Sequence, residues 1–126
     1  MEERIMAKRI FISFAIEDES IRNMLVGQKK NPNSPIEFAD WSVHEPWDSS
    51  WKTKCRERIK KCAGLLVIVT KNTKKADGQL WEVKCANEEG LSIRGINGYK
   101  DDNSKLDNVT MMNWTWDNIK NWINSL

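Results

Sequence analysis

The chain has 126 residues, of which 40% are hydrophobic and 30% are charged, and its formal net charge is +2. This length suits one domain and is too short for two cores, while the composition argues against disorder and fibrous repeats. The small, evenly mixed charge leaves no electrostatic footprint for nucleic acid. With no apolar run near the roughly 20 residues of a membrane span and no signal-peptide pattern, we expect one cytoplasmic domain over residues 1–126.

The cysteines and the histidine do not indicate a metal site. Cys55, Cys62 and Cys85 form no CxxC pair, and His44 is the one histidine in the sequence. This spacing matches no metal-ligand pattern. We therefore expect reduced packing thiols, no metal and no cofactor.

The first half of the sequence predicts two strands and a helix between them. Residues 9–14 form the near-continuous apolar run of a strand that is buried on both faces. Asp18 or Ser20 is expected to cap the following helix, which ends near a turn rich in Asn and Pro at residues 31–35. A short strand at residues 36–39 follows.

A loop with an unusual number of aromatic and polar side chains precedes the second helix. Residues 40–48, DWSVHEPWD, hold two tryptophans, the histidine and a proline, which is more than a simple connector requires. Ser49 is expected to cap the next helix, and Gly64 to end it. Its core-facing stripe repeats at helical spacing. The stripe consists of Trp51, Cys55, Ile59 and Cys62.

The second half continues the alternation. Residues 65–69 read as a central strand because their branched aliphatic character is unbroken. After a polar loop, a helix is predicted at residues 78–89 with Gly90 as its stop, and a strand at residues 91–96. A weak strand at residues 109–112 and a terminal helix complete the chain. The apolar face of that helix is formed by Trp116, Ile119, Trp122, Ile123 and Leu126.

Alternating strands and helices predict an α/β fold: a three-layer flavodoxin-like sandwich whose five parallel strands run in the order 2-1-3-4-5. Ligands bind such sheets beyond the carboxyl ends of the strands, where the strand order reverses. Ser13, Phe14 and Ala15 leave the first strand at this edge. Two small side chains would allow close approach of a ligand, and the phenyl ring would allow stacking.

Two common occupants of this fold do not suit the sequence. A phosphorylated receiver needs an aspartate at the end of the third strand, where this chain has Val69, Thr70 and Lys71. A glycine-rich phosphate loop is also absent, since the first turn, FAIEDES, has three acids and no glycine. Glu82, about one turn into the helix after the central strand, has two interpretations. It either offsets the positive helix end, worth about 0.3–1 kcal/mol, or takes part in catalysis.

Four segments in order, KRIFISFAIEDE, IEFADWS, LLVIVTKNT and GQLWEVKCA, resemble the TIR-like family typified by the small subunit of Thoeris antiphage defence. The resemblance covers about residues 8–97. It implies a flavodoxin-like fold and an enzyme that cleaves the nicotinamide glycosidic bond of NAD. In Thoeris the product is a cyclic ADP-ribose signal that activates an effector protein. NAD would be the substrate, with self-association through TIR-like surfaces and no contact with nucleic acid or membrane.

The same resemblance assigns residues. Glu82 takes the place of the catalytic glutamate, and residues 40–48 take the place of the loop that closes over the dinucleotide. Many TIR enzymes have a tryptophan one turn before the glutamate, where this chain has Gly78, so stacking would come from other aromatic residues. The implied substrate-contacting residues are Ser13, Phe14, Ala15, Asp40, Trp41, Trp47 and Trp81.

The main alternative is a non-catalytic TIR-like interaction module with exposed tryptophans as its partner surface. A single carboxylate suits the enzyme, because it can stabilise the oxocarbenium-like ribose left when nicotinamide departs. The surroundings of Glu82 separate the two hypotheses. An enzyme requires this carboxylate at the floor of a pocket with Ser13 or Phe14 opposite, whereas a module would place it in a salt bridge on a flat surface.

Overall fold

The computed structural model describes residues 8–28, 36–39 and 50–126 of the chain. The strands are β1 (Lys8–Ser13), β2 (Ile36–Ala39), β3 (Gly64–Val69), β4 (Ser92–Asn97) and β5 (Thr110–Met111). The helices are α1 (Glu19–Gly27), α2 (Trp51–Lys60), α3 (Asp77–Glu88) and α4 (Trp116–Asn124), with short 3-10 helices at Ile16–Asp18 and Thr73–Lys75. All strand pairs are parallel, in the order β2-β1-β3-β4-β5. The predicted flavodoxin-like topology is confirmed.

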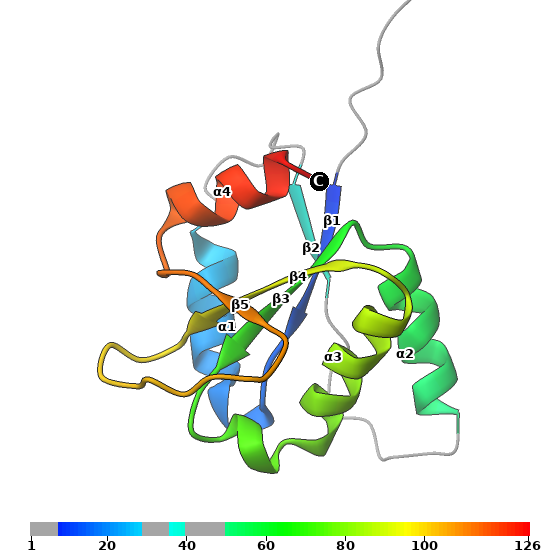
Figure 1. The fold of residues 1–126 in the computed structure, drawn as a ribbon, viewed down its shortest axis with the longest axis horizontal. Coiled ribbons are helices and arrows are strands. Elements are labelled where there is room, and N and C mark those ends of the chain that lie inside the picture. Colours follow the sequence, from blue (N-terminus) through cyan, green and yellow to red (C-terminus); the bar gives the residue numbers. More distant parts are fainter. Residues whose placement is uncertain (1–7, 29–35, 40–49) are drawn as a thin grey trace, which may run out of the picture.

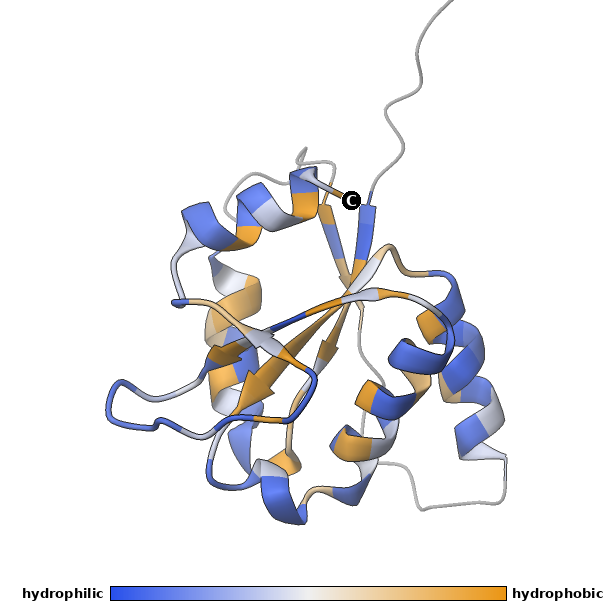
Figure 2. Ribbon diagram, in the orientation of Figure 1, coloured by the Kyte–Doolittle hydropathy of each residue, from blue (hydrophilic) through white to orange (hydrophobic). Residues whose placement is uncertain are grey.

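The sheet lies between two helical layers (Figure 1). Helices α1 and α4 cover one face, and α2 and α3 cover the other. The central strands of the sheet are coloured mainly as hydrophobic in Figure 2. Every residue of β3 is buried. As predicted, β3 is therefore the central strand, enclosed on both faces.

Two local predictions were wrong, each because tertiary contacts override a local signal. Asp18 occupies the N-cap position of α1 but makes no capping hydrogen bond, because its side chain turns to other loops. Gly64 does not end a helix: α2 ends at Lys60, and Gly64 begins β3. Gly90 follows α3 with φ of 75°, as expected of a helix stop. Ser49 and the turn at residues 31–35 lie outside the described residues.

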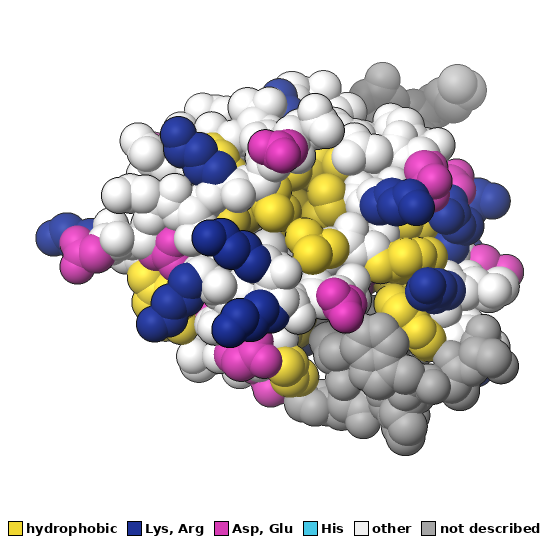
Figure 3. Space-filling view, turned by 60° about the horizontal axis from the view of Figure 1, so that its bottom comes forward, with side chains coloured by type: hydrophobic (Ala, Val, Ile, Leu, Met, Phe, Trp, Pro, Cys, Tyr) yellow, Lys and Arg dark blue, Asp and Glu magenta, His cyan; other side chains and the backbone are white. Residues whose placement is uncertain are grey.

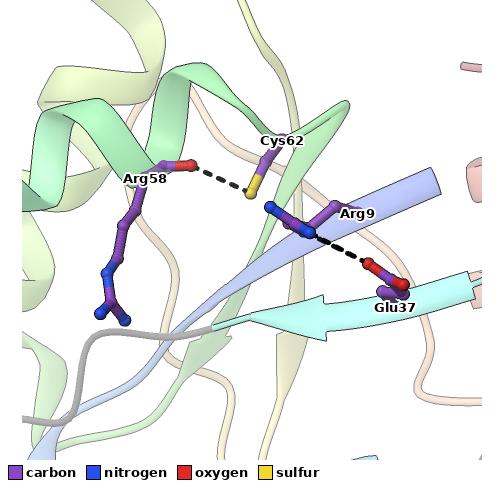
Figure 4. A network of polar contacts seen from close by, with 4 residues as sticks. All are labelled: Arg9, Glu37, Arg58 and Cys62. Atoms are coloured by element: carbon purple, nitrogen blue, oxygen red, sulfur yellow. Dashed lines mark hydrogen bonds and ion pairs between the residues drawn. The ribbon is translucent and has the colours of Figure 1, made fainter. Parts of the chain in front are cut away.

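The amino-terminal half of the sheet carries a surface ion pair near a buried thiol (Figure 4). Arg9 on β1 and Glu37 on β2 approach to 3.3 Å, and each side chain is about half exposed, so the pair contributes little stability. Cys62 donates to the carbonyl oxygen of Arg58 at 3.4 Å. Burial raises the pKa of Cys62 to about 11, which Arg9 only partly opposes, so this thiol stays protonated near neutral pH.

Gly64 allows α4 to pack closely on the start of β3. A Cβ atom there would lie 2.9 Å from Cζ2 of Trp122 and 3.0 Å from Cδ1 of Leu126. The indole of Trp122 is held by a 3.0 Å hydrogen bond from Nε1 to Oγ of Ser92. Gly64→Ala should therefore lower the free energy of unfolding by about 1–3 kcal/mol through overpacking, as measured by urea denaturation.

Gly27 provides the matched control for this substitution. It lies at the end of α1, and a Cβ atom there would meet nothing within 4 Å. Gly27→Ala should leave stability unchanged or raise it by up to about 1 kcal/mol, because alanine loses less backbone entropy. Equal effects of the two substitutions would show that close packing at Gly64 is not what requires glycine.

Candidate functional site

Glu82 is buried at the carboxyl end of β1, with only 6% of the residue exposed. Its Oε1 accepts a 2.7 Å hydrogen bond from Oγ of Ser13, the last residue of β1. Its Oε2 accepts a longer contact, 3.8 Å, from the thiol of Cys55 on α2. The carboxylate thus lies where α3 meets both the sheet and α2, and Ser13 is the residue opposite it.

The alternation of β1 decides which of its residues reach Glu82. Phe11 packs in the core under α2 and α3, and Ser13, two residues later, faces the same side. Phe14 belongs to the opposite core, with the guanidinium of Arg22 at 5.9 Å from its ring centroid. The structure therefore brings Ser13 to Glu82 and places Phe14 across the sheet. Ala15, 1% exposed, accepts at its carbonyl from the amide of Asp18.

Gln79 is a third member of this cluster that sequence reasoning missed. Its side chain is buried, and Nε2 donates to the carbonyl oxygens of Ser13 at 3.2 Å and Ile68 at 2.7 Å. The amide thereby fixes α3 to the ends of β1 and β3. The sequence feature that could have identified Gln79 is its spacing, because a polar residue three positions before Glu82 lies on the same face of the helix.

Trp81 faces α2 rather than β1. Its ring lies edge-on to Trp51, with centroids 5.1 Å apart and planes at 63°. The guanidinium of Arg56 lies 5.7 Å from the Trp81 ring centroid and also pairs with Glu88 and Glu89. Asp40, Trp41, His44 and Trp47 lie outside the described residues.

A second buried carboxylate, Asp18, joins three loops at the same edge of the sheet. Fully buried, it accepts from Oγ1 of Thr70 at 2.5 Å, Nδ2 of Asn72 at 2.9 Å and the hydroxyl of Tyr99 at 3.3 Å. These donors follow β3 and β4, whereas Asp18 follows β1. The pKa of Tyr99 is raised by burial and then by Asp18. The cluster anchors the segment that leads from β3 into α3.

The surroundings of Glu82 favour stabilisation of positive charge. Ser13 and Cys55 are neutral donors, and the pKa of Cys55 is raised first by burial and then by the charge of Glu82. The thiol therefore remains protonated and can donate. In a site shielded from water, a carboxylate interacts with a cation more strongly than it would in bulk solvent.

The described residues support no metal site and no membrane span. No group of three or more His, Cys, Asp or Glu side chains among them is arranged to hold a metal ion. Within the same ranges, no helix has the length and apolar character needed to cross a bilayer.

A cavity of about 440 Å³ lies at the carboxyl ends of β4 and β5, and Glu82 is not among its lining residues. Its lining consists of Asn97, Gly98, Tyr99, Lys100, Asp102, Asn103, Met112, Asn113 and Trp114. Figure 3 brings the lower side of Figure 1 forward, where hydrophobic side chains gather centrally between Lys and Arg side chains.

One residue that lines the cavity, Asp102, has a lowered pKa. Burial acts to raise this pKa, but hydrogen bonds from Ser104 and from the amide of Lys71 lower it overall.

Comparison with known proteins places the chain in a family. No protein with a curated description matches the chain. A solved structure, a diflavin flavoprotein A3 from Nostoc sp., is similar with 15% identity and a TM-score of 0.47 over 77% of this chain and 64% of that one. This chain thus spans less than two thirds of that structure's length. The protein-family model described as Thoeris protein ThsB, TIR-like domain, matches residues 11–104 of the chain. The chain therefore belongs to the family of the TIR-like domain of Thoeris protein ThsB.

Proposed function

We propose that the chain is a TIR-like enzyme that cleaves the nicotinamide glycosidic bond of NAD. The observation that supports this proposal is the position of Glu82, a buried carboxylate at the carboxyl edge of the sheet that accepts a hydrogen bond from Ser13. The resemblance noted in the sequence aligns this residue with the catalytic glutamate of the family. Membership of the Thoeris family supports the assignment.

The chemistry requires little beyond a well-placed negative charge. The bond between ribose C1′ and the pyridinium nitrogen breaks, and its electron pair neutralises the departing nicotinamide. Because the leaving group is already cationic, it needs no acid. Glu82 would stabilise the positive charge that develops on the ribose, as carboxylates do in glycosidase transition states. Water, or a nucleophile elsewhere in the dinucleotide, then bonds to C1′.

Antiphage signalling is part of the same proposal. A cyclic ADP-ribose product forms only if water is kept from C1′ while an internal nucleophile is aimed at it. The resemblance gives the closing role to residues 40–48. The product would diffuse in the cytoplasm to a separate effector protein, and self-association through TIR-like surfaces would assist catalysis.

Incubation of purified protein with NAD tests the proposal. Nicotinamide and the ADP-ribose products are measured by liquid chromatography and mass spectrometry over a wide range of protein concentrations, because self-association is expected to matter. We expect nicotinamide release together with a cyclic or linear ADP-ribose product. If NAD stays intact at every concentration, the enzymatic assignment fails and the interaction module is the remaining function.

A further inference from the structure

The side-chain amide of Gln79 has a fixed orientation. Nε2 donates to the backbone oxygens of Ser13 and Ile68, at 3.2 Å and 2.7 Å. Carbonyl oxygens only accept, so the NH2 group must face both strands. Oε1 of Gln79 therefore points away from the ends of β1 and β3.

This oxygen is an unpaired acceptor. Among the buried side-chain nitrogen and oxygen atoms of residues 8–28, 36–39 and 50–126, Gln79 Oε1 is the one without a hydrogen-bond partner. The residue is only 3% exposed. Native proteins satisfy nearly all such atoms, and the exceptions concentrate where a ligand or a mechanism needs them. A donor on a bound ligand would complete this site.

The unpaired oxygen belongs to the Glu82 cluster. Gln79 and Glu82 are three residues apart and share one face of α3. Ser13 contacts both residues: its Oγ donates to Oε1 of Glu82 at 2.7 Å and lies 3.5 Å from the backbone carbonyl oxygen of Gln79. A group that approaches Glu82 on this face of α3 therefore lies within one helical turn of the Gln79 side chain.

The reaction favours one type of donor. As the C1′–N bond breaks, positive charge builds on the ribose, and its hydroxyls become stronger donors. The carboxamide of nicotinamide becomes a weaker hydrogen-bond donor at the same time, since its ring loses the positive charge. Only an interaction that strengthens in the transition state accelerates the reaction. Building on the proposed function, we propose that Oε1 of Gln79 accepts a hydrogen bond from the ribose hydroxyl next to C1′ and so selects for ribose.

The test compares NAD with an analogue that lacks this hydroxyl, the 2′-deoxyribose form on the nicotinamide side. The preference for NAD is the ratio of the two kcat/KM values. In Gln79→Met, which removes the acceptor at similar volume, this ratio should fall by about tenfold relative to wild type. Because each ratio is measured within one protein, it does not depend on the folded fraction, and comparison with wild type cancels the intrinsic reactivity of the analogue.

Two further variants complete the test. Gln28→Met removes a glutamine at the end of α1 whose Oε1 accepts from Nε1 of Trp114 at 2.9 Å, and it should keep the wild-type ratio. Gln79→Leu removes the same acceptor with another apolar side chain of similar volume and should lower the ratio to the same extent. It keeps the test decisive should Gln79→Met fail to fold.

The outcomes separate this inference from the proposed function. A wild-type ratio in Gln79→Met or in Gln79→Leu would overturn the role of Gln79 while the NAD assignment stands. If Gln79→Met instead loses its preference for NAD over the 3-acetylpyridine analogue, the donor is the carboxamide and the ribose assignment is wrong. Failure of the wild type to release nicotinamide from either dinucleotide would overturn both proposals.

Discussion

Glu82→Gln should lower the rate of nicotinamide release from NAD by about 10²–10³-fold, the loss typical of removing one electrostatic group from a transition state. Glutamine matches the size of Glu82 and can still accept from Ser13, so the cluster keeps its shape. What is lost is the negative charge opposite the developing cation. A neutral amide also avoids the desolvation cost of a buried charge, so the melting temperature should stay within a few degrees.

Glu57 offers the matched control, since it lies on α2 with an exposed side chain. Glu57→Gln makes the same chemical change away from the cluster and should retain the wild-type rate. Initial rates of nicotinamide release and thermal unfolding are measured for all three proteins. Equal release by wild type and Glu82→Gln would end the catalytic assignment of this residue.

Asp18→Ala should lower the free energy of unfolding by about 3 kcal/mol. The carboxylate is fully buried and accepts from Thr70, Asn72 and Tyr99. Alanine leaves these donors without their acceptor and opens a space inside the protein, and both effects are among the mechanisms behind large losses of stability. The loops after β1, β3 and β4 lose their common anchor. Urea denaturation gives the change through the midpoint at constant slope.

Glu17 is the neighbour that isolates this effect. It is acidic and lies in the same short 3-10 helix, but it is exposed. Glu17→Ala should change stability by no more than about 0.5 kcal/mol. If Asp18→Ala is as mild as Glu17→Ala, the buried hydrogen bonds of Asp18 do not hold the loops together.

The fold was predictable because its signals are local and repeated. The unbroken aliphatic run in β3 identified the central strand, and alternation with amphipathic helices left few other topologies. The edge that carries Ser13 and the helix that carries Glu82 followed from the same rules. The hydrogen bond between Ser13 and Glu82 then required only that α3 pack beside β1.

The remaining features depend on contacts between distant segments. Asp18 has the sequence signature of a helix cap, but its carboxylate accepts hydrogen bonds from residues 52 to 81 positions away. Gly64 looked like a helix stop, whereas it is required by the ring of Trp122. Gln79 gave only the weak signal of its spacing from Glu82, because its two acceptors are backbone oxygens of β1 and β3.

A crystal structure of Glu82→Gln with NAD tests the central claim most directly, since the slowed variant should retain the intact dinucleotide. The mechanism predicts that ribose C1′ lies within about 4 Å of the residue 82 side chain, beside its hydrogen bond with Ser13. NAD bound with its nicotinamide ribose elsewhere, for example in the cavity at the ends of β4 and β5, would contradict it.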